Sequence, residues 1–391
     1  MTIFHWVDGS PWELGKLVSI LIGVCVLVAV LGAYLFYKKT QQSKNLPRQV
    51  LPTAPAPAPK AVPVVERRPV SRRAWTRMPD ALKEFRFVRQ TELEPARLAA
   101  LAGKLHTIPR PPSALHKLVS TEFLSSATSA ELSEIVMGEP SVAAKVLAVA
   151  NSPLYGLQQL VGNIDAAVKF LGMNTVRSIC LQYMMDDSFK AGSPEMKKVY
   201  ERLWNQSALA CELCFKLAQL LKLEEPGTFV TQIVLSCIGR QATYSLMEQA
   251  DVLVIASKGL LERSRLEQQT LGLASVEIGG LLMQDWALPK NIINIVKEID
   301  ATLVAPVAET STSRRTRNAL CYLCCRMAEG LANGDIVDLG TFDVAKQEDA
   351  EYFHLHAYLE LPAMVPVAEF LRSPEVTTSI NRMLATMKVH Q

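Results

Sequence analysis

The sequence predicts an all-α protein, and three observations support this fold class. Apolar residues recur at three- to four-residue spacing along most of the chain after about Pro79. No segment combines strict two-residue alternation with a hairpin turn, although the short β-branched run Val252–Ile255 fits either class. The chain has 391 residues, 49% of them hydrophobic, which is enough for a large helical core.

Residues 1–16 are a short N-terminal segment, and residues 17–37 then run for 21 positions without a charge. About 20 apolar residues span the hydrocarbon core of a bilayer as a helix. A cleaved signal peptide has basic residues before a shorter apolar region, whereas here Asp8 and Glu13 come before it. A buried soluble helix is less favoured, because nothing interrupts the apolar run. We therefore expect one transmembrane helix over residues 17–37.

The charges that follow this segment predict its orientation. Ten Lys or Arg and one acidic residue lie between Lys38 and Arg77. Because positive flanks remain cytoplasmic, the N-terminus is expected outside and the bulk of the chain in the cytoplasm. Residues 78–391 retain 30 basic and 35 acidic residues, a net charge of −5. A nucleic-acid-binding domain gathers Lys and Arg on its folded part, so no nucleic-acid partner is expected.

The basic linker at residues 38–78 is rich in proline, with seven prolines in residues 46–70. Such a composition favours extended polyproline II structure over helix or sheet, and it predicts a semi-rigid spacer. Two further roles remain open for this linker. It could be a ligand for a proline-binding partner, or its basic residues could lie on anionic lipid.

Helical periodicity predicts the elements of the folded part in order. The expected helices cover residues 93–105, 113–124, 129–136, 140–150, 164–171, 176–185, 196–221, 229–238, 244–256, 264–273, 276–286, 316–331, 347–359 and 365–387. We assign residues 79–305 to one helical domain. Residues 306–391 are C-terminal helices that we expect to pack on the same bundle.

The stretch from residue 139 to 172 predicts a helix, a sharp turn and a second helix. Pro140 suits a first helical turn. The first helix stops before Pro153, because the residue that precedes a proline is pushed out of the α region. Gly156 supplies a permissive backbone within the turn, and Gly172 follows the second helix as a C′ glycine would.

Three residues of this turn, Asn151, Ser152 and Tyr155, have two interpretations. In the structural one, the Asn and Ser side chains bond to backbone groups freed at the turn, while the Tyr ring packs on the bundle. In the functional one, they form a partner-binding surface. We favour the structural interpretation, because turn chemistry alone accounts for these residue types.

Together with segments on both sides, this stretch resembles the bacterial HDOD domain, a catalytically silent relative of the HD-type metal phosphohydrolases. The motifs that carry the resemblance are L-H-T-I-P-R-P-P (105–112), N-S-P-L-Y-G (151–156), A-V-K-F-L-G (167–172), L-W-N-Q-S-A-L-A with Trp204 (203–210), L-S-C-I-G (235–239) and D-W-A-L-P (285–289). The resemblance covers roughly half of the chain and implies a multi-helical HDOD-like bundle.

Active HD enzymes bind metal with histidines and a His-Asp doublet, and the resemblance places other residues at those positions. They are Gln206 at the first His, Ser236 and Cys237 at the doublet, Ser275 at a later His, and Ile299 and Asp300 at a final pair. No histidine occurs between residues 117 and 353. The resemblance thus implies no metal, no cofactor and no catalytic residue. We expect side chains such as Cys237 to fill the vacated space, giving a packed core.

Two C-x-x-C pairs, Cys211 with Cys214 and Cys321 with Cys324, suggest zinc. However, 106 residues separate the pairs, both lie on predicted helices among apolar neighbours, and no loop offers ligand geometry. Reduced core cysteines are the favoured interpretation, and no disulfide is expected.

Two functional classes remain. The favoured one is a membrane-anchored, non-enzymatic signal-transduction module that binds other proteins, with its single span in a bacterial inner membrane. Its partners are unidentified signalling or structural proteins. The alternative is a divergent metal-dependent phosphohydrolase that uses other carboxylates such as Asp300. No phosphate-binding glycine loop and no nucleophile with a nearby base occur in the sequence.

Overall fold

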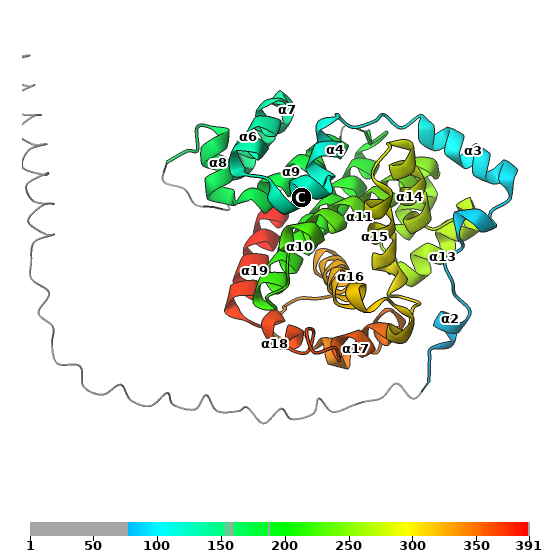
Figure 1. The fold of residues 1–391 in the computed structure, drawn as a ribbon. Helices are drawn as coiled ribbons and strands as arrows, with labels where there is room; N and C mark the ends of the chain where they lie inside the picture. Colours follow the sequence, from blue (N-terminus) through cyan, green and yellow to red (C-terminus); the bar gives the residue numbers. More distant parts are fainter. Residues whose placement is uncertain (1–76, 153–154, 156–158, 187, 390–391) are drawn as a thin grey trace, which may run out of the picture. The chain divides into compact units, whose positions relative to one another are not determined.

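The structure, a computed structural model, describes residues 77–389 except residues 153–154, 156–158 and 187 (Figure 1). The expected N-terminal segment and transmembrane helix lie outside the described residues, as do the linker up to residue 76, Pro153 and Gly156. Every regular element in the described part is a helix, which confirms the all-α prediction. None of these described helices is both long and apolar enough to span a bilayer.

The helices follow one another as α2 (Asp80–Lys83), η1 (Gln90–Glu92), α3 (Pro95–His106), α4 (Ala114–Val119), α5 (Thr121–Ser126), α6 (Ser129–Met137), α7 (Pro140–Ala150), α8 (Ile164–Leu171), α9 (Met173–Asp186), α10 (Pro194–Leu220), α11 (Pro226–Leu246), α12 (Gln249–Ile255), α13 (Leu260–Leu271), α14 (Ser275–Asp285), α15 (Lys290–Ala301), η3 (Val307–Glu309), α16 (Thr312–Asn333), η4 (Val344–Lys346), η5 (Ala350–Tyr352), α17 (Phe353–Leu359), α18 (Val367–Leu371) and α19 (Pro374–Val389).

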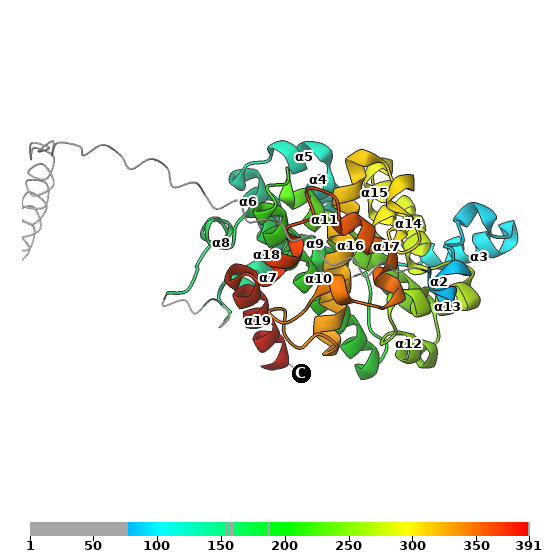
Figure 2. The same ribbon diagram turned by 90° about the horizontal axis from the view of Figure 1, so that it is seen from below.

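Helix α10 is the element around which the others pack (Figures 1 and 2). It begins where Ser193 accepts a hydrogen bond from the Met196 N–H at 3.2 Å, and Pro194 occupies its first turn. Leu209, Leu213 and Leu217 recur at four-residue spacing and are fully buried. Helix α10 packs against both α11 and α16, and α14 in turn packs against α11.

Helices α6 to α9 pack on one another and hold the central turn of the sequence. The first of them begins with a capping box, in which Thr128 accepts from the Glu131 N–H and the Glu131 side chain accepts from the Thr128 N–H. Helix α8 starts where Asn163 accepts from the Ala166 N–H at 2.8 Å. Gly172 follows α8 with φ of +83°, a backbone conformation that side chains disfavour.

Two predicted helix boundaries need correction. The single helix expected over residues 113–124 is two helices, α4 and α5, because Ser120 is extended and its hydroxyl accepts from the Phe123 N–H. The helix expected over residues 365–387 is also divided, into α18 and α19, and Pro374 opens the second.

A third correction concerns residues 229–256. Two helices with a gap before Tyr244 were expected, but α11 continues through Gly239 to Leu246, and the break comes at residues 247–248. Gly239 therefore lies inside a helix, and α14 lies directly against it. Helix α15, which periodicity left unassigned, buries Ile292, Ile293, Val296 and Ile299.

The last described helices pack on the same core as the earlier ones. Helix α16 lies against α10, α11 and α15, and α19 lies against α10. Figure 2 shows α18 and α19, in red, beside α10. Ser379 of α19 donates a hydrogen bond to Glu212 of α10 at 2.5 Å.

Candidate functional site

Five of the six residues that the HDOD resemblance places at metal positions surround one pocket of about 60 Å³. They come from four helices and are Gln206 of α10, Ser236 and Cys237 of α11, Ser275 of α14 and Asp300 of α15. The sixth, Ile299, faces the apolar core instead and is 1% exposed. The structure therefore brings together residues that lie up to 94 positions apart in the sequence.

The expected packed core at this place needs correction, because charged side chains line a pocket there. Arg240 of α11, Arg263 of α13, and Arg326 and Glu329 of α16 complete its wall. Cys237 contributes to the wall, but its thiol lies 3.8 Å from the carbonyl oxygen of Leu203, next to a small apolar cluster. A guanidinium needs hydrogen-bond acceptors when it is buried, so these groups cannot collapse into an apolar core.

Glu329 is the centre of this charged wall and pairs with all three arginines. Its carboxylate lies 2.5 Å from Arg240 Nη1, 3.0 Å from Arg263 Nη2 and 2.5 Å from Arg326 Nη1. The arginines come from three different helices, so the carboxylate connects α11, α13 and α16. We call Arg240, Arg263, Arg326 and Glu329 the arginine–glutamate cluster.

A second layer of groups supports the arginine–glutamate cluster from behind. Arg240 also donates to Gln206 Oε1 at 2.9 Å. Arg326 lies 3.3 Å from Glu351, whose other oxygen accepts from the Leu261 N–H at 2.9 Å.

Glu267 supports the cluster on the side of α13. Its two carboxylate oxygens accept from the Ser275 N–H at 2.8 Å and from the Ser275 hydroxyl at 2.5 Å. One oxygen also lies 3.9 Å from Arg263. Ser275, which the HDOD resemblance places at a histidine position, is thus held by a carboxylate and is not free to serve as a ligand.

The carboxyl groups around the pocket differ in their pKa values. Burial acts to raise the pKa of Glu329, but the charges of its three arginine partners outweigh burial and lower this pKa to about 2. Burial raises the pKa of Asp300, against the opposing effect of Arg326 and Arg263. The cluster therefore contains one firmly ionised carboxylate, while Asp300 is protonated more readily than an exposed aspartate.

A divalent metal does not fit this pocket. Three guanidinium groups line it and would repel a cation. Among the residues that the HDOD resemblance places at metal positions, Asp300 is the only carboxylate. Gln206, Ser236 and Ser275 offer weak neutral oxygens. Across the described residues, no group of three or more His, Cys, Asp or Glu side chains is placed to hold a metal ion.

Sequence reasoning missed the arginine–glutamate cluster. One signal was available: Arg240 follows Cys237 by three residues, so the two share a helix face. Arg326 and Glu329 have the same spacing on α16. Nothing in the sequence connects those two pairs with each other or with Arg263.

The described family-motif residues of the central turn, Asn151, Ser152 and Tyr155, do not line the pocket. The Asn151 side chain accepts from the Val161 N–H at 2.7 Å and donates to the Val161 carbonyl oxygen at 3.0 Å. The Tyr155 ring meets Phe170 edge to face, with 5.4 Å between ring centroids. The contacts of Asn151 and Tyr155 are of the kind that the structural interpretation describes. For Ser152 that interpretation named the side chain, whereas the bond in the structure is one that its backbone carbonyl accepts from the Tyr155 N–H.

Trp204, the aromatic residue of the motif on α10, lies near the end of α9. Its indole N–H donates to Asp186 at 2.8 Å. The first and last motifs also meet, because the His106 ring lies 2.7 Å from Asp285. Motifs that are far apart in the sequence therefore hold the helices of one bundle together.

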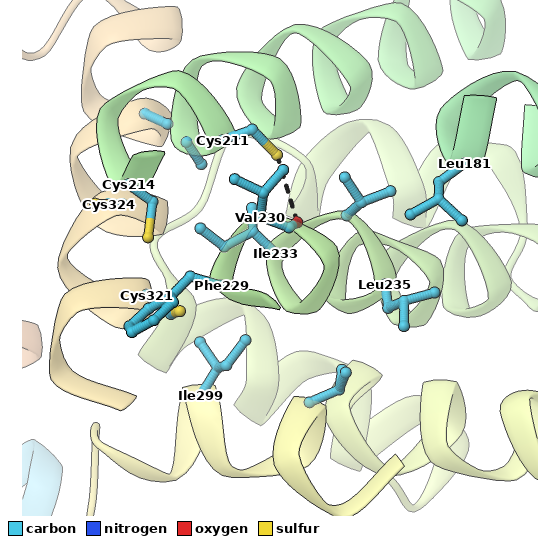
Figure 3. Close-up of a cluster of buried hydrophobic side chains, with 14 of the residues drawn as sticks. Leu181, Cys211, Cys214, Phe229, Val230, Ile233, Leu235, Ile299, Cys321 and Cys324 are labelled. Carbon is cyan, nitrogen blue, oxygen red and sulfur yellow. Dashed lines mark hydrogen bonds between the residues drawn. The ribbon is translucent and has the colours of Figure 1, made fainter. Parts of the chain in front are cut away.

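The two C-x-x-C pairs meet in the structure despite their separation in the sequence. Figure 3 shows Cys211 and Cys214 on α10 close to Cys321 and Cys324 on α16, among apolar side chains. The described cysteines are free thiols, and burial raises the pKa of Cys214 well above its usual value. Zinc binds the thiolate form of cysteine, and burial in this apolar core disfavours the thiolate. Burial is therefore a stronger argument against a zinc site than the sequence separation of the two pairs.

Comparison with known proteins agrees with this architecture. The sequence profile of the HDOD domain matches residues 108–302. No protein of curated function matches the chain. The matched range ends before α16, so Arg326 and Glu329 come from outside it.

Several solved structures have a similar fold. One is a candidate phosphohydrolase from Shewanella amazonensis SB2B, with a TM-score of 0.51 and 21% identity, where the match covers 74% of this chain and 98% of that one. Another is an HDOD domain protein of unknown function from Geobacter sulfurreducens, with a TM-score of 0.51, 15% identity, and 74% and 96% covered. A third is a candidate signal transduction protein from Marinobacter aquaeolei VT8, with a TM-score of 0.50, 17% identity, and 75% and 65% covered. The chain therefore contains an HDOD domain, formed by residues 108–302.

Proposed function

We propose that this chain is a non-enzymatic signal-transduction module whose HDOD domain acts by binding other proteins. The observation that carries the proposal is the arginine–glutamate cluster, which lines the same pocket as five of the residues that the HDOD resemblance places at metal positions. HD chemistry uses a metal to generate hydroxide and to bind a phosphoryl oxygen. Three arginines and a carboxylate already paired with them do not supply such a site. A structural neighbour named as a candidate signal transduction protein adds to this proposal.

The first experiment tests the absence of metal chemistry. Full-length protein, solubilised in detergent and purified without chelators, is analysed for Fe, Mn, Ni and Zn, and its phosphodiesterase activity is assayed on nucleotides and cyclic dinucleotides. We expect no stoichiometric metal, and activity at background level with each metal added. One bound metal per chain, with activity abolished by Asp300→Ala, would reverse the conclusion.

That reversal would support the second candidate, a divergent phosphohydrolase. Asp300 lines the pocket and offers one carboxylate, which is the observation in its favour. One structural neighbour is named as a candidate phosphohydrolase. We rank this candidate second, because one carboxylate does not bind a catalytic metal alone.

The proposal places the module on the cytoplasmic face of a bacterial inner membrane, attached by one helix over residues 17–37. The uncharged run and its basic C-terminal flank support this placement. A reporter that is active only in the cytoplasm, fused after Gln391, should be active. A reporter that is active only in the periplasm, fused at the same position, is the matched control and should be inactive.

The partners are proposed to be signalling or structural proteins, with no nucleic acid among them. Affinity capture of the solubilised full-length chain, followed by identification of the proteins retained, tests this. A partner should be retained in proportion to the captured chain, and nuclease treatment should not release it. Release by nuclease would contradict the proposal.

A further inference from the structure

The arginine–glutamate cluster leaves open space beside it. The pocket wall includes three guanidinium groups that approach from α11, α13 and α16. Ser236, Val276 and Cys325 also line the pocket and are partly exposed, so it opens to solvent there. The space in it that is open to water-sized molecules is about 60 Å³. One water needs about 10–15 Å³ of such space. The space thus suits a few waters or one compact polyatomic ion.

Three donors of the residues at this wall have no oxygen or nitrogen acceptor among the described residues. The Ser207 hydroxyl, 5% exposed, has no oxygen or nitrogen partner among the described residues, and the weakly polar Cys211 thiol lies beside it. The Nε–H groups of Arg240 and of Arg326, which is 6% exposed, also have no such acceptor there. A buried donor without an acceptor is unfavourable. A ligand that supplies acceptor oxygens would satisfy these groups.

The charges of the wall favour an anion. Arg240, Arg263 and Arg326 carry three positive charges against two negative charges on Glu329 and Asp300. Glu267 and Glu351 stand behind the wall, where each already accepts a backbone N–H and faces one arginine. Guanidinium groups bind multi-oxygen anions through two parallel hydrogen bonds. Arginines from several helices around a compact space match a tetrahedral anion better than a flat carboxylate.

We propose that this pocket binds a phosphate group, as inorganic phosphate or as the terminal group of a small phosphate monoester, through Arg240, Arg326 and Ser207. Glu329 holds the three arginines in position when the ligand is absent, and its negative charge limits the affinity. The inference stands independently of the proposed signalling function, because a ligand can bind here whether or not the chain acts on it.

Calorimetric titration of the full-length protein tests the inference, with inorganic phosphate, glycerol 3-phosphate and acetate as probes at millimolar concentration and matched ionic strength. We expect phosphate or the monoester to bind, and acetate not to bind. Tighter binding of the monoester would identify an esterified ligand, whereas equal or tighter binding of inorganic phosphate would identify the free ion. Binding of neither phosphate, or acetate bound as tightly as phosphate, would overturn the inference.

Three variants locate the site. Ser207→Ala removes only the unpartnered hydroxyl, and Arg240→Lys keeps the charge but loses the planar fork. Each should weaken phosphate binding by roughly tenfold, as expected for one lost hydrogen bond to a charged group. Ser133→Ala is the matched control, since Ser133 of α6 is also buried without a partner but lies away from the pocket.

The result is decisive in each direction. Weaker binding in Ser207→Ala or Arg240→Lys, with none lost in Ser133→Ala, supports the inference. Unchanged binding in both pocket variants, or an equal loss in the control, overturns it. Release of inorganic phosphate from the monoester would contradict the proposed non-enzymatic function while leaving the binding inference intact, so the two proposals can fail separately.

Discussion

Gly239 of α11 and Gly279 of α14 face each other where the two helices cross. A Cβ atom added to Gly279 would lie 2.7 Å from the Cα atom of Gly239, and one added to Gly239 would collide with the carbonyl oxygen of Ser275. Both obstructions are backbone atoms, which cannot move without shifting a helix. Cys237 lies within one turn of Gly239 in α11, and Ser275 lies about one turn before Gly279 in α14. The close approach of the two helices therefore brings both residues to the same pocket.

The first prediction follows from this crossing. Gly239→Ala should lower the free energy of unfolding by about 1–3 kcal/mol, because overpacking outweighs the better helix propensity of alanine. Chemical denaturation measures the change. Gly103→Ala in α3 is the matched control, since nothing lies within 4 Å of its Cβ position; it should stabilise the protein by about 0.5–1 kcal/mol. Equal effects of the two substitutions would contradict the close approach.

The second prediction concerns Glu329. Glu329→Gln should lower the free energy of unfolding at pH 7 by about 3–5 kcal/mol, because it leaves three buried arginines without their shared counter-charge. Glu201→Gln, which breaks an exposed pair with Lys197 at 3.8 Å, is the control and should cost less than about 1 kcal/mol.

The same variant has a pH dependence with a definite sign. The pKa of Glu329 is lowered from 4.5 to about 2. Its stabilising charge interaction is therefore fully present above pH 4.5 and is lost as the pH falls toward 2. The stability difference between wild-type protein and Glu329→Gln should shrink over this range, as measured by denaturation at several pH values. A constant difference would show that Glu329 is not ionised in the folded protein.

The third prediction concerns Asn151. Asn151→Ala removes both hydrogen bonds to Val161 and should lower the free energy of unfolding by about 1–3 kcal/mol. The Val161 amide should then exchange its hydrogen faster. Asn163→Ala is the control, because Asn163 accepts from the Ala166 N–H instead; it should expose that amide and leave Val161 protected. An unchanged hydrogen exchange rate of the Val161 amide in Asn151→Ala would contradict the two hydrogen bonds between Asn151 and Val161.

The fourth prediction separates packing from partner binding at Tyr155. Tyr155→Ala should lower the melting temperature of the protein, because the ring loses its edge-to-face contact with Phe170. Leu160→Ala is the control, because Leu160 is 79% exposed. The melting temperature of this variant should equal that of the wild-type protein. Loss of captured partners at an unchanged melting temperature would favour a partner-binding surface instead.

The fifth prediction concerns the buried thiols. Burial raises the pKa of Cys211 and of Cys237 to about 12, and it also raises the pKa of the other described cysteines. Since the thiolate is the reactive form, an alkylating reagent at pH 8 should label these residues slowly in the folded protein and rapidly after denaturation. Mass spectrometry of the labelled peptides measures this. Rapid labelling of Cys214 in the folded protein would contradict its burial in a packed core.

Local patterns predicted most helices of the described part. Apolar spacing identified α10, whose observed bounds differ from the expected ones by one or two residues. It failed at residues 239–243, where a gap between two helices was expected, because α11 continues through Gly239 and the packing of α14 requires a glycine there. It also failed at Ser120, whose capping hydroxyl interrupts an apolar run.

The candidate site could be predicted only in part. Motif resemblance identified residues such as Gln206 and Asp300, and five of those six positions do surround one pocket. It did not predict the arginine–glutamate cluster that lines the same pocket. Arg263 and Glu329 resemble ordinary helix-surface charges in the sequence, and they are buried only because residues of α11, α13 and α16 meet around them.

The sequence by itself determined the helical class, the order of most helices and the turn that Asn151 closes, because these depend on residues a few helical turns apart. The tertiary structure alone decided that Arg240, Arg263 and Glu329 share one buried cluster. The physical reason is that the energy of a charge depends on its surroundings. An arginine in water and an arginine in a pocket look the same in sequence, and only the packing of distant helices removes the water and supplies the partner.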